Sequence, residues 1–153
     1  MRNQKDWGFT LLEIMLVVVI LSMLAAIAVP RLAASAETAR QKADITSGRE
    51  VKSALDRYQV DNGVYPRIGE LQEVNGSISG SALIPAYIRK LDVQVTQQNP
   101  AEEKKGFGLA EWRGGGESPE PKRLIMIYLT TDGSAAEVTV YDRTLAKVLW
   151  SSI

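Results

Sequence analysis

The sequence contains neither cysteine nor histidine. Without cysteine the chain cannot form a disulfide, a zinc–thiolate site or a cysteine nucleophile. Without histidine it lacks the commonest general acid–base catalyst and a frequent metal ligand. Any catalysis would have to rely on carboxylate, lysine, tyrosine or serine side chains alone. We therefore expect this protein not to be an enzyme.

An excess of charge of either sign is also absent, because 18 Lys and Arg residues balance 18 Asp and Glu residues. A protein that binds nucleic acid by neutralising phosphates usually has a basic excess. We therefore predict no nucleic-acid partner. No glycine-rich phosphate-binding motif follows a strand and opens a helix, so we expect no cofactor. The 153 residues suffice for one ordinary domain and one long segment outside its core.

One long apolar segment is present close to the N-terminus. Residues 1–8 form a polar, basic leader, and residues 14–29 form an apolar run that only Ser22 interrupts. Residues 9–29 together match the roughly 20 residues that a helix needs to cross the core of a bilayer. Because the positive charge precedes the span, the pattern predicts an N-terminus in the cytoplasm.

Glu13 distinguishes this segment from simpler membrane-targeted sequences. A charge near the start of a membrane span costs up to about 3 kcal/mol, and a plain single-pass anchor has no use for it. A cleaved secretory signal is the other alternative, because the sequence Ala34-Ser35-Ala36 fits a small-residue cleavage site. The apolar run is, however, longer than the roughly 7–15 residues typical of such a signal.

Residues 8–13, with the sequence Gly-Phe-Thr-Leu-Leu-Glu, and the apolar helix after them, with its proline at Pro30, resemble a known motif. It is the prepilin-type processing and methylation motif that type IV pilins and type II secretion pseudopilins share. The resemblance implies that a prepilin peptidase cuts after Gly8 and methylates the new N-terminus at Phe9. Glu13 would then be the fifth residue of the mature chain.

The resemblance also implies a role in assembly. Glu13 would meet the N-terminal ammonium on Phe9 of a neighbouring subunit, and this pairing would set the axial register of the helices. Each charge alone would be costly inside a bundle of apolar helices, and pairing offsets that cost. The implied partners are the prepilin peptidase, copies of this chain and other pilin-like subunits in a helical filament, an assembly platform membrane protein and its ATPase system.

The predicted helix continues beyond the membrane span. Val51, Ala54, Leu55 and Tyr58 are spaced at i, i+3, i+4 and i+7, which predicts an apolar stripe on an amphipathic helix. The Asn-Gly pair within residues 61–66 is typical of a helix end, and a similar phrase closes the long helix of many pilins. We also expect Pro30 to bend the helix, because its ring blocks a backbone hydrogen bond, and Gly48 to be a weak point.

Residues 67–100 are predicted to form a long connection with one short helix near residues 86–91. Strands are then predicted at residues 107–112, 124–130, 137–141 and 147–151, from apolar runs, alternation and turn signals. The predicted fold is α+β and pilin-like: a long N-terminal helix, membrane-spanning in its first half, packed on a small antiparallel sheet of three or four strands.

The predicted organisation has four parts. Residues 1–8 are a leader that is removed, residues 9–30 are the transmembrane and filament-core half of the helix, residues 31–60 are its amphipathic half, and residues 61–153 are an extracytoplasmic head. The chain would first lie in the inner membrane with its head outside. It would then enter a periplasmic or extracellular filament.

Acidic and hydroxyl side chains gather near the C-terminus, namely Asp132, Ser134, Glu137 and Asp142. Major pseudopilins carry a calcium site in the corresponding region, but their glycine-rich segment with paired acidic residues is missing here. We therefore expect no metal. The predicted function is that of a structural subunit of a type IV pilus or a type II secretion pseudopilus. The alternative is a membrane-tethered or exported binding module that does not polymerise.

Overall fold

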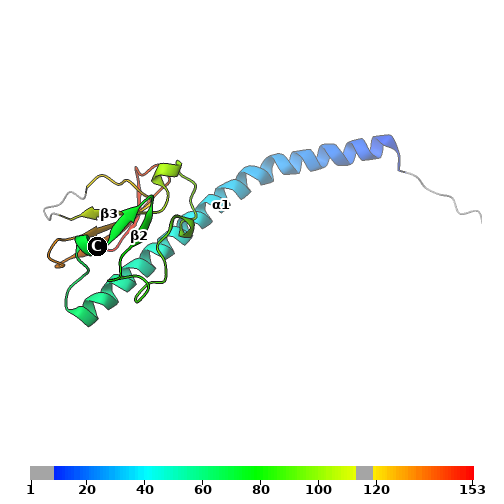
Figure 1. Ribbon diagram of the computed structural model, residues 1–153. Coiled ribbons are helices and arrows are strands. Elements are labelled where there is room, and N and C mark those ends of the chain that lie inside the picture. The colour runs from blue at the N-terminus through cyan, green and yellow to red at the C-terminus, as the bar shows by residue number, and fades with distance from the viewer. Residues whose placement is uncertain (1–8, 113–118) are drawn as a thin grey trace, which may run out of the picture. The chain divides into compact units, whose positions relative to one another are not determined.

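The computed structural model describes residues 9–112 and 119–153 (Figure 1). Gly8 and the rest of the predicted leader lie outside the described residues. The described chain begins with one long helix, α1 (Leu11–Asn62), and continues into strands and short 3-10 helices. The strands are β1 (Gln72–Val74), β2 (Ser77–Ser79), β3 (Phe107–Glu111), β4 (Ile125–Leu129), β5 (Ala136–Tyr141) and β6 (Val148–Ser151). The 3-10 helices are η1 (Ile68–Glu70), η2 (Val93–Val95) and η3 (Glu102–Lys104).

Local hydrogen bonds define both ends of α1. The Glu13 backbone N–H donates to the Thr10 hydroxyl over 3.2 Å, so Thr10 caps the N-terminus. At the other end Gly63 has a φ of 80°, and its N–H donates to the Gln59 carbonyl over 2.8 Å. This left-handed glycine confirms the predicted helix end. The helix continues through Pro30, and the bend expected there stays a prediction.

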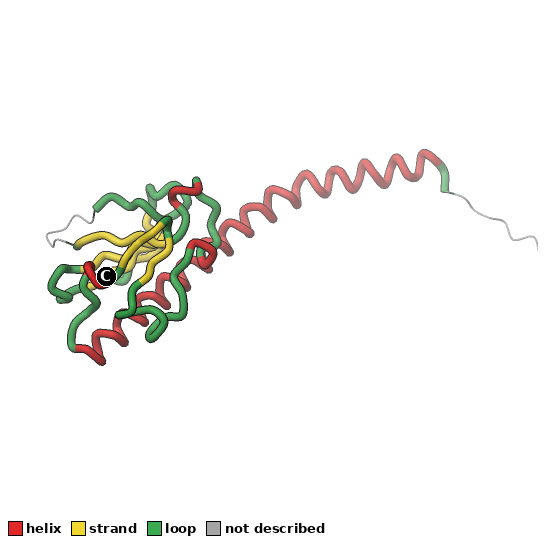
Figure 2. The backbone as a smooth tube through the Cα atoms, viewed as in Figure 1, coloured by secondary structure: helices red, strands yellow, loops and turns green. Residues whose placement is uncertain are grey.

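The described chain divides into two units between residues 37 and 38, and α1 contributes to both. In the second unit Val51, Ala54 and Leu55 are fully buried against the sheet, while Tyr58 is partly buried at the edge of the same core. Figure 2 shows the strands lying along this part of the helix. The predicted apolar stripe is therefore confirmed as the face of α1 that holds the head.

The main sheet has the order β3-β4-β5-β6. Its four strands lie where the sequence predicted them, and β4–β5 and β5–β6 are antiparallel as expected. The prediction of a purely antiparallel sheet was wrong in one pair, because β3 runs parallel to β4, with Phe107 opposite Ile125. A parallel pair needs a crossover of about a dozen residues or more, and residues 112–124 are long enough to return the chain to the same end.

The region predicted to be a connection contains further pairing. Strands β1 and β2 form an antiparallel hairpin whose turn residues, Asn75 and Gly76, have φ values of 50° and 78°. The short helix expected near residues 86–91 is absent, and that segment consists of turn, bend and irregular chain. Its last residue, Leu91, instead bridges Ile78, whose N–H donates to the Leu91 carbonyl over 2.7 Å. A tertiary strand contact thus overrides the local helical preference.

Candidate assembly surfaces

The first unit presents an apolar surface on α1. Every large apolar side chain between Leu11 and Val29 is exposed, with exposed fractions from 47 % to 78 %. One 18-residue window of the helix has a mean hydropathy of 2.8, and none of that window is buried. By length and composition α1 is able to cross a membrane. We call residues 11–29 the apolar helix surface.

Glu13 lies in the first turn of this helix, one turn after Phe9. The pattern Thr10-x-x-Glu13 matches the capping-box sequence, and a carboxylate there interacts favourably with the positive end of the helix dipole. Thr10 was not among the residues predicted from the sequence, although its spacing from Glu13 is visible there. Phe9 is exposed and precedes the cap, so it lies outside the helix.

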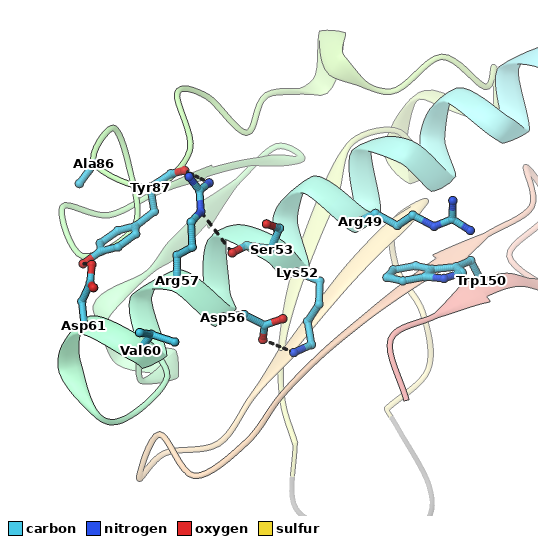
Figure 3. Close-up of a pocket in the computed structure, with 10 residues that line it drawn as sticks. All are labelled: Arg49, Lys52, Ser53, Asp56, Arg57, Val60, Asp61, Ala86, Tyr87 and Trp150. Carbon is cyan, nitrogen blue, oxygen red and sulfur yellow. Dashed lines mark hydrogen bonds and ion pairs between the residues drawn. The ribbon is translucent and has the colours of Figure 1, made fainter.

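The second unit contains an open groove along the exposed face of α1 (Figure 3). Its volume is about 650 Å³, and it lies between α1, the loop around Tyr87 and strand β6. We call it the basic groove, and its lining residues are Arg49, Lys52, Ser53, Asp56, Arg57, Val60, Asp61, Ala86, Tyr87 and Trp150.

Two tyrosines from loops form hydrogen bonds with carboxylates near the C-terminal end of α1. Tyr65 donates its hydroxyl to Asp56 over 3.0 Å, and Asp56 also pairs with Lys52. Burial opposes the charge on Lys52, but its hydrogen bonds to Asp56 and Tyr65 outweigh that effect and raise its pKa. Tyr87 donates its hydroxyl to Asp61 over 3.0 Å, and its ring meets that of Tyr58 edge-on at 5.3 Å.

The two arginines of the basic groove make different contacts. Arg57 donates to the carbonyl of Tyr87 over 2.7 Å and more weakly to the carbonyl of Ser53 over 3.4 Å. Arg49 lies over the ring of Trp150, 5.8 Å from its centroid, in a cation–π contact. Trp150 comes from β6, so its contact with Arg49 was not predictable from the sequence.

A second groove lies where β3 and β4 end. Its volume is about 620 Å³, and its charged residues, Glu111 and Asp132, are both acidic. The backbone N–H of Ser134 and then its hydroxyl donate to Asp132, which lowers the pKa of this exposed carboxyl to about 2. We call it the acidic groove, and its lining residues are Glu111, Trp112, Thr130, Thr131, Asp132, Ser134 and Ala135.

A buried carboxylate of α1 forms hydrogen bonds with a loop that is distant along the chain. Asp44 is fully buried and accepts hydrogen bonds from the N–H of Gln97 over 2.6 Å and from the N–H and side-chain amide of Gln98 over 3.1 and 3.0 Å. The same Gln98 amide donates to the carbonyl of Tyr141 over 3.0 Å. The sequence contained no signal for this contact, since Asp44 resembles any other charged residue of the helix.

The acidic residues near the C-terminus lie in separate places. Asp132 and Ser134 share one turn, and Glu137 is buried and accepts hydrogen bonds from Thr139 and Ser151. Asp142 accepts from the Thr144 hydroxyl and from two backbone N–H groups in the turn before β6. Within residues 9–112 and 119–153 no group of three or more His, Cys, Asp or Glu side chains is arranged to hold a metal ion.

The chain is similar to proteins named type II secretion system core protein G. It is 49 % identical to that of Vibrio cholerae over 65 residues, which are 42 % of this chain and 44 % of the relative. It is 56 % identical over 65 residues to that of Pectobacterium carotovorum, covering 40 % of each chain. It is 44 % identical over 64 residues to that of Escherichia coli. Over this stretch the chain is similar to the core protein G proteins of type II secretion.

The homology confirms the predicted resemblance to pilins and type II secretion pseudopilins. It covers a limited stretch, because the chain spans less than half the length of the curated relatives it matches. No family model matches the chain. No solved structure matches it either.

Proposed function

We propose that the chain is a structural subunit of a type II secretion pseudopilus. The observation that carries this proposal is the apolar helix surface, which remains exposed in a homologue of core protein G. Exposed apolar area of this extent is strongly unfavourable in water, so it requires a cover. Lipid provides that cover before assembly, and the helices of other subunits provide it in the filament.

Glu13 and Phe9 set the register of these helices. Cleavage after Gly8 creates an ammonium group on Phe9, next to the positive end of the helix dipole of its own chain. That position disfavours a second positive charge, so the ammonium needs a carboxylate partner. Glu13 of a neighbouring subunit supplies it, and an axial shift between the helices leaves both charges unpaired in an apolar environment.

The proposed life cycle follows the four predicted parts of the chain. The prepilin peptidase removes residues 1–8 on the cytoplasmic side, and residues 9–30 hold the subunit in the inner membrane. The head, residues 61–153, lies outside and is joined to the membrane by residues 31–60. An assembly platform and its ATPase system then draw the subunit into the filament. No catalytic activity and no cofactor form part of this role.

The decisive experiment is mass spectrometry of the N-terminal peptide from membranes and from sheared filaments. We expect a mature chain that begins with N-methylated Phe9 and is present in both fractions. A chain that begins at Glu37 would mean signal-peptide cleavage and would overturn the proposal. A matched pair of variants, Glu13→Ala and Ser22→Ala, should separate assembly from anchoring. Both variants should reach the membrane, and only Glu13→Ala should fail to enter filaments.

The alternative is a processed, membrane-tethered binding module. It shares the apolar helix surface, and the grooves of the head are where a ligand would bind. Deleting the gene distinguishes the two functions. Loss of the filament supports the structural subunit, whereas intact filaments support the binding module.

A further inference from the structure

The basic groove carries positive charge that its own residues leave without an acidic partner. Arg49 and Arg57 are eight residues apart on α1, which places them on one face about 12 Å apart along the helix axis. Arg57 bonds only to carbonyl oxygens, and Arg49 lies over Trp150. Neither guanidinium forms an ion pair with a carboxylate in the described part of the chain.

The carboxylates of this groove are already engaged. Asp56 pairs with Lys52 and accepts the hydroxyl of Tyr65, and Asp61 accepts the hydroxyl of Tyr87. The lining has three basic side chains, Arg49, Lys52 and Arg57, against these two carboxylates, so the groove carries an excess of one positive charge. Figure 3 shows both arginine side chains along the same groove, with Trp150 beside Arg49.

The acidic groove has the opposite character. Among the described residues of its lining there is no lysine or arginine, and the carboxylate of Asp132 is exposed at the tip of its turn. Trp112 provides a half-buried aromatic wall, as Trp150 does in the basic groove. Both grooves lie within the unit of residues 38–153.

We propose that the acidic groove of one copy of this chain docks against the basic groove of the next copy. This inference rests on the proposed filament function and names the surfaces through which the heads meet. Arginine pairs well with carboxylates because its planar donors match their geometry. Two different surfaces meet at each contact, so the interface is heterologous and leaves one groove free at each end. Such an interface propagates into an open helical assembly.

The occupant is a second copy because both complementary surfaces are present on every copy. The chain as a whole has no net charge, so attraction between copies depends on how the charge is distributed. The two grooves separate that charge within one head. A contact of this kind supplements the burial of the apolar helix surface and fixes the rotation of each head relative to the next.

Cysteine cross-linking tests the docking directly, because the chain contains no cysteine of its own. Ser53 lines the basic groove, and Thr131 lines the acidic groove, and both are exposed. In full-length chains in their native host, the double variant S53C/T131C treated with a short bis-maleimide should give a ladder of multimers. The matched control S53C/S79C places the second cysteine at the exposed last residue of β2, outside both grooves, and should give no ladder.

Charge variants of the cross-linkable chain then test the pairing. Arg49→Glu or Asp132→Lys alone should abolish the ladder, and the two together should restore it. Asp132→Asn keeps an acceptor oxygen for Ser134 but removes the charge, so it should weaken the ladder without disturbing the turn. Two results would overturn the proposed docking but leave the proposed function standing. One is filaments in which S53C/T131C gives no cross-link, and the other is a ladder that the charge substitutions leave unchanged. A wild-type chain that forms no filament would overturn the proposed function and the docking with it.

Discussion

Gly48 of α1 and Val140 of β5 approach so closely that a Cβ atom on Gly48 would lie 2.5 Å from Val140 Cγ2. The same atom would lie 3.4 Å from the Trp150 ring, so the helix rests directly on β5 and β6 at this point. Gly48 is buried. Gly48 was predicted to be a weak point of the helix, whereas in the structure it is a site of close helix–sheet contact.

Gly48→Ala should therefore destabilise the head, although alanine favours helix by about 1 kcal/mol. Overpacking of a tight core costs about 1–3 kcal/mol, so we expect a small net loss, and a larger one for Gly48→Val. Denaturant unfolding of the detergent-solubilised chain, followed by tryptophan fluorescence, measures both. Gly69→Ala is the control, because a Cβ at that position meets nothing within 4 Å. An unchanged or higher stability of Gly48→Ala would contradict the close contact.

Removing the buried acceptor at Asp44 should be more damaging. Asp44→Ala leaves two backbone N–H groups and the Gln98 amide without their acceptor, and we expect a loss of about 3 kcal/mol or more in the free energy of unfolding. The loop that contains Gln97 and Gln98 should also exchange its amide hydrogens faster. Thr46→Ala, on the exposed face of the same helix turn, should change the stability little. Equal effects of the two substitutions would show that Asp44 does not hold the loop.

Thr10→Ala should loosen the start of α1. The Thr10 hydroxyl accepts the Glu13 N–H, and loss of such a cap costs about 1 kcal/mol. In micelles we expect faster hydrogen exchange at the Glu13 amide, whereas Thr10→Ser should retain the protection because serine caps equally well. Unchanged exchange in Thr10→Ala would mean that another group caps the helix.

The turn at Asp132 should respond to acid. Its pKa is lowered from 3.8 to about 2, first by the Ser134 N–H and then by the Ser134 hydroxyl. The charged form is therefore favoured in the folded state, so its stabilising effect is complete above pH 3.8 and is lost as the pH falls towards 2. The difference in stability between the wild type and Asp132→Asn should shrink over this interval. Carboxyl chemical shifts measure the pKa directly, and a value near 3.8 would contradict the hydrogen-bonded turn.

Much of the architecture could be predicted because its causes are local. The apolar run of residues 14–29, the stripe that includes Val51 and Leu55, and the Asn62-Gly63 cap are each encoded within a few turns of chain. The four strands of the main sheet follow from apolar runs and turn signals in the same way. The roles of Gly8, Phe9 and Glu13 came from the motif and remain predictions of the sequence.

Other features depend on partners that are distant along the chain. The direction of β3 follows from its parallel pairing with β4, and Leu91 bridges Ile78. Asp44 and Gln98 are 54 residues apart, and Gly48 meets a strand from the C-terminal part of the chain. Hydrophobic periodicity records which face of an element is buried, but it does not record what that face meets. The sequence by itself therefore determined the long apolar helix and the positions of the main strands, and only the tertiary structure decided which charges became buried, paired or gathered into grooves.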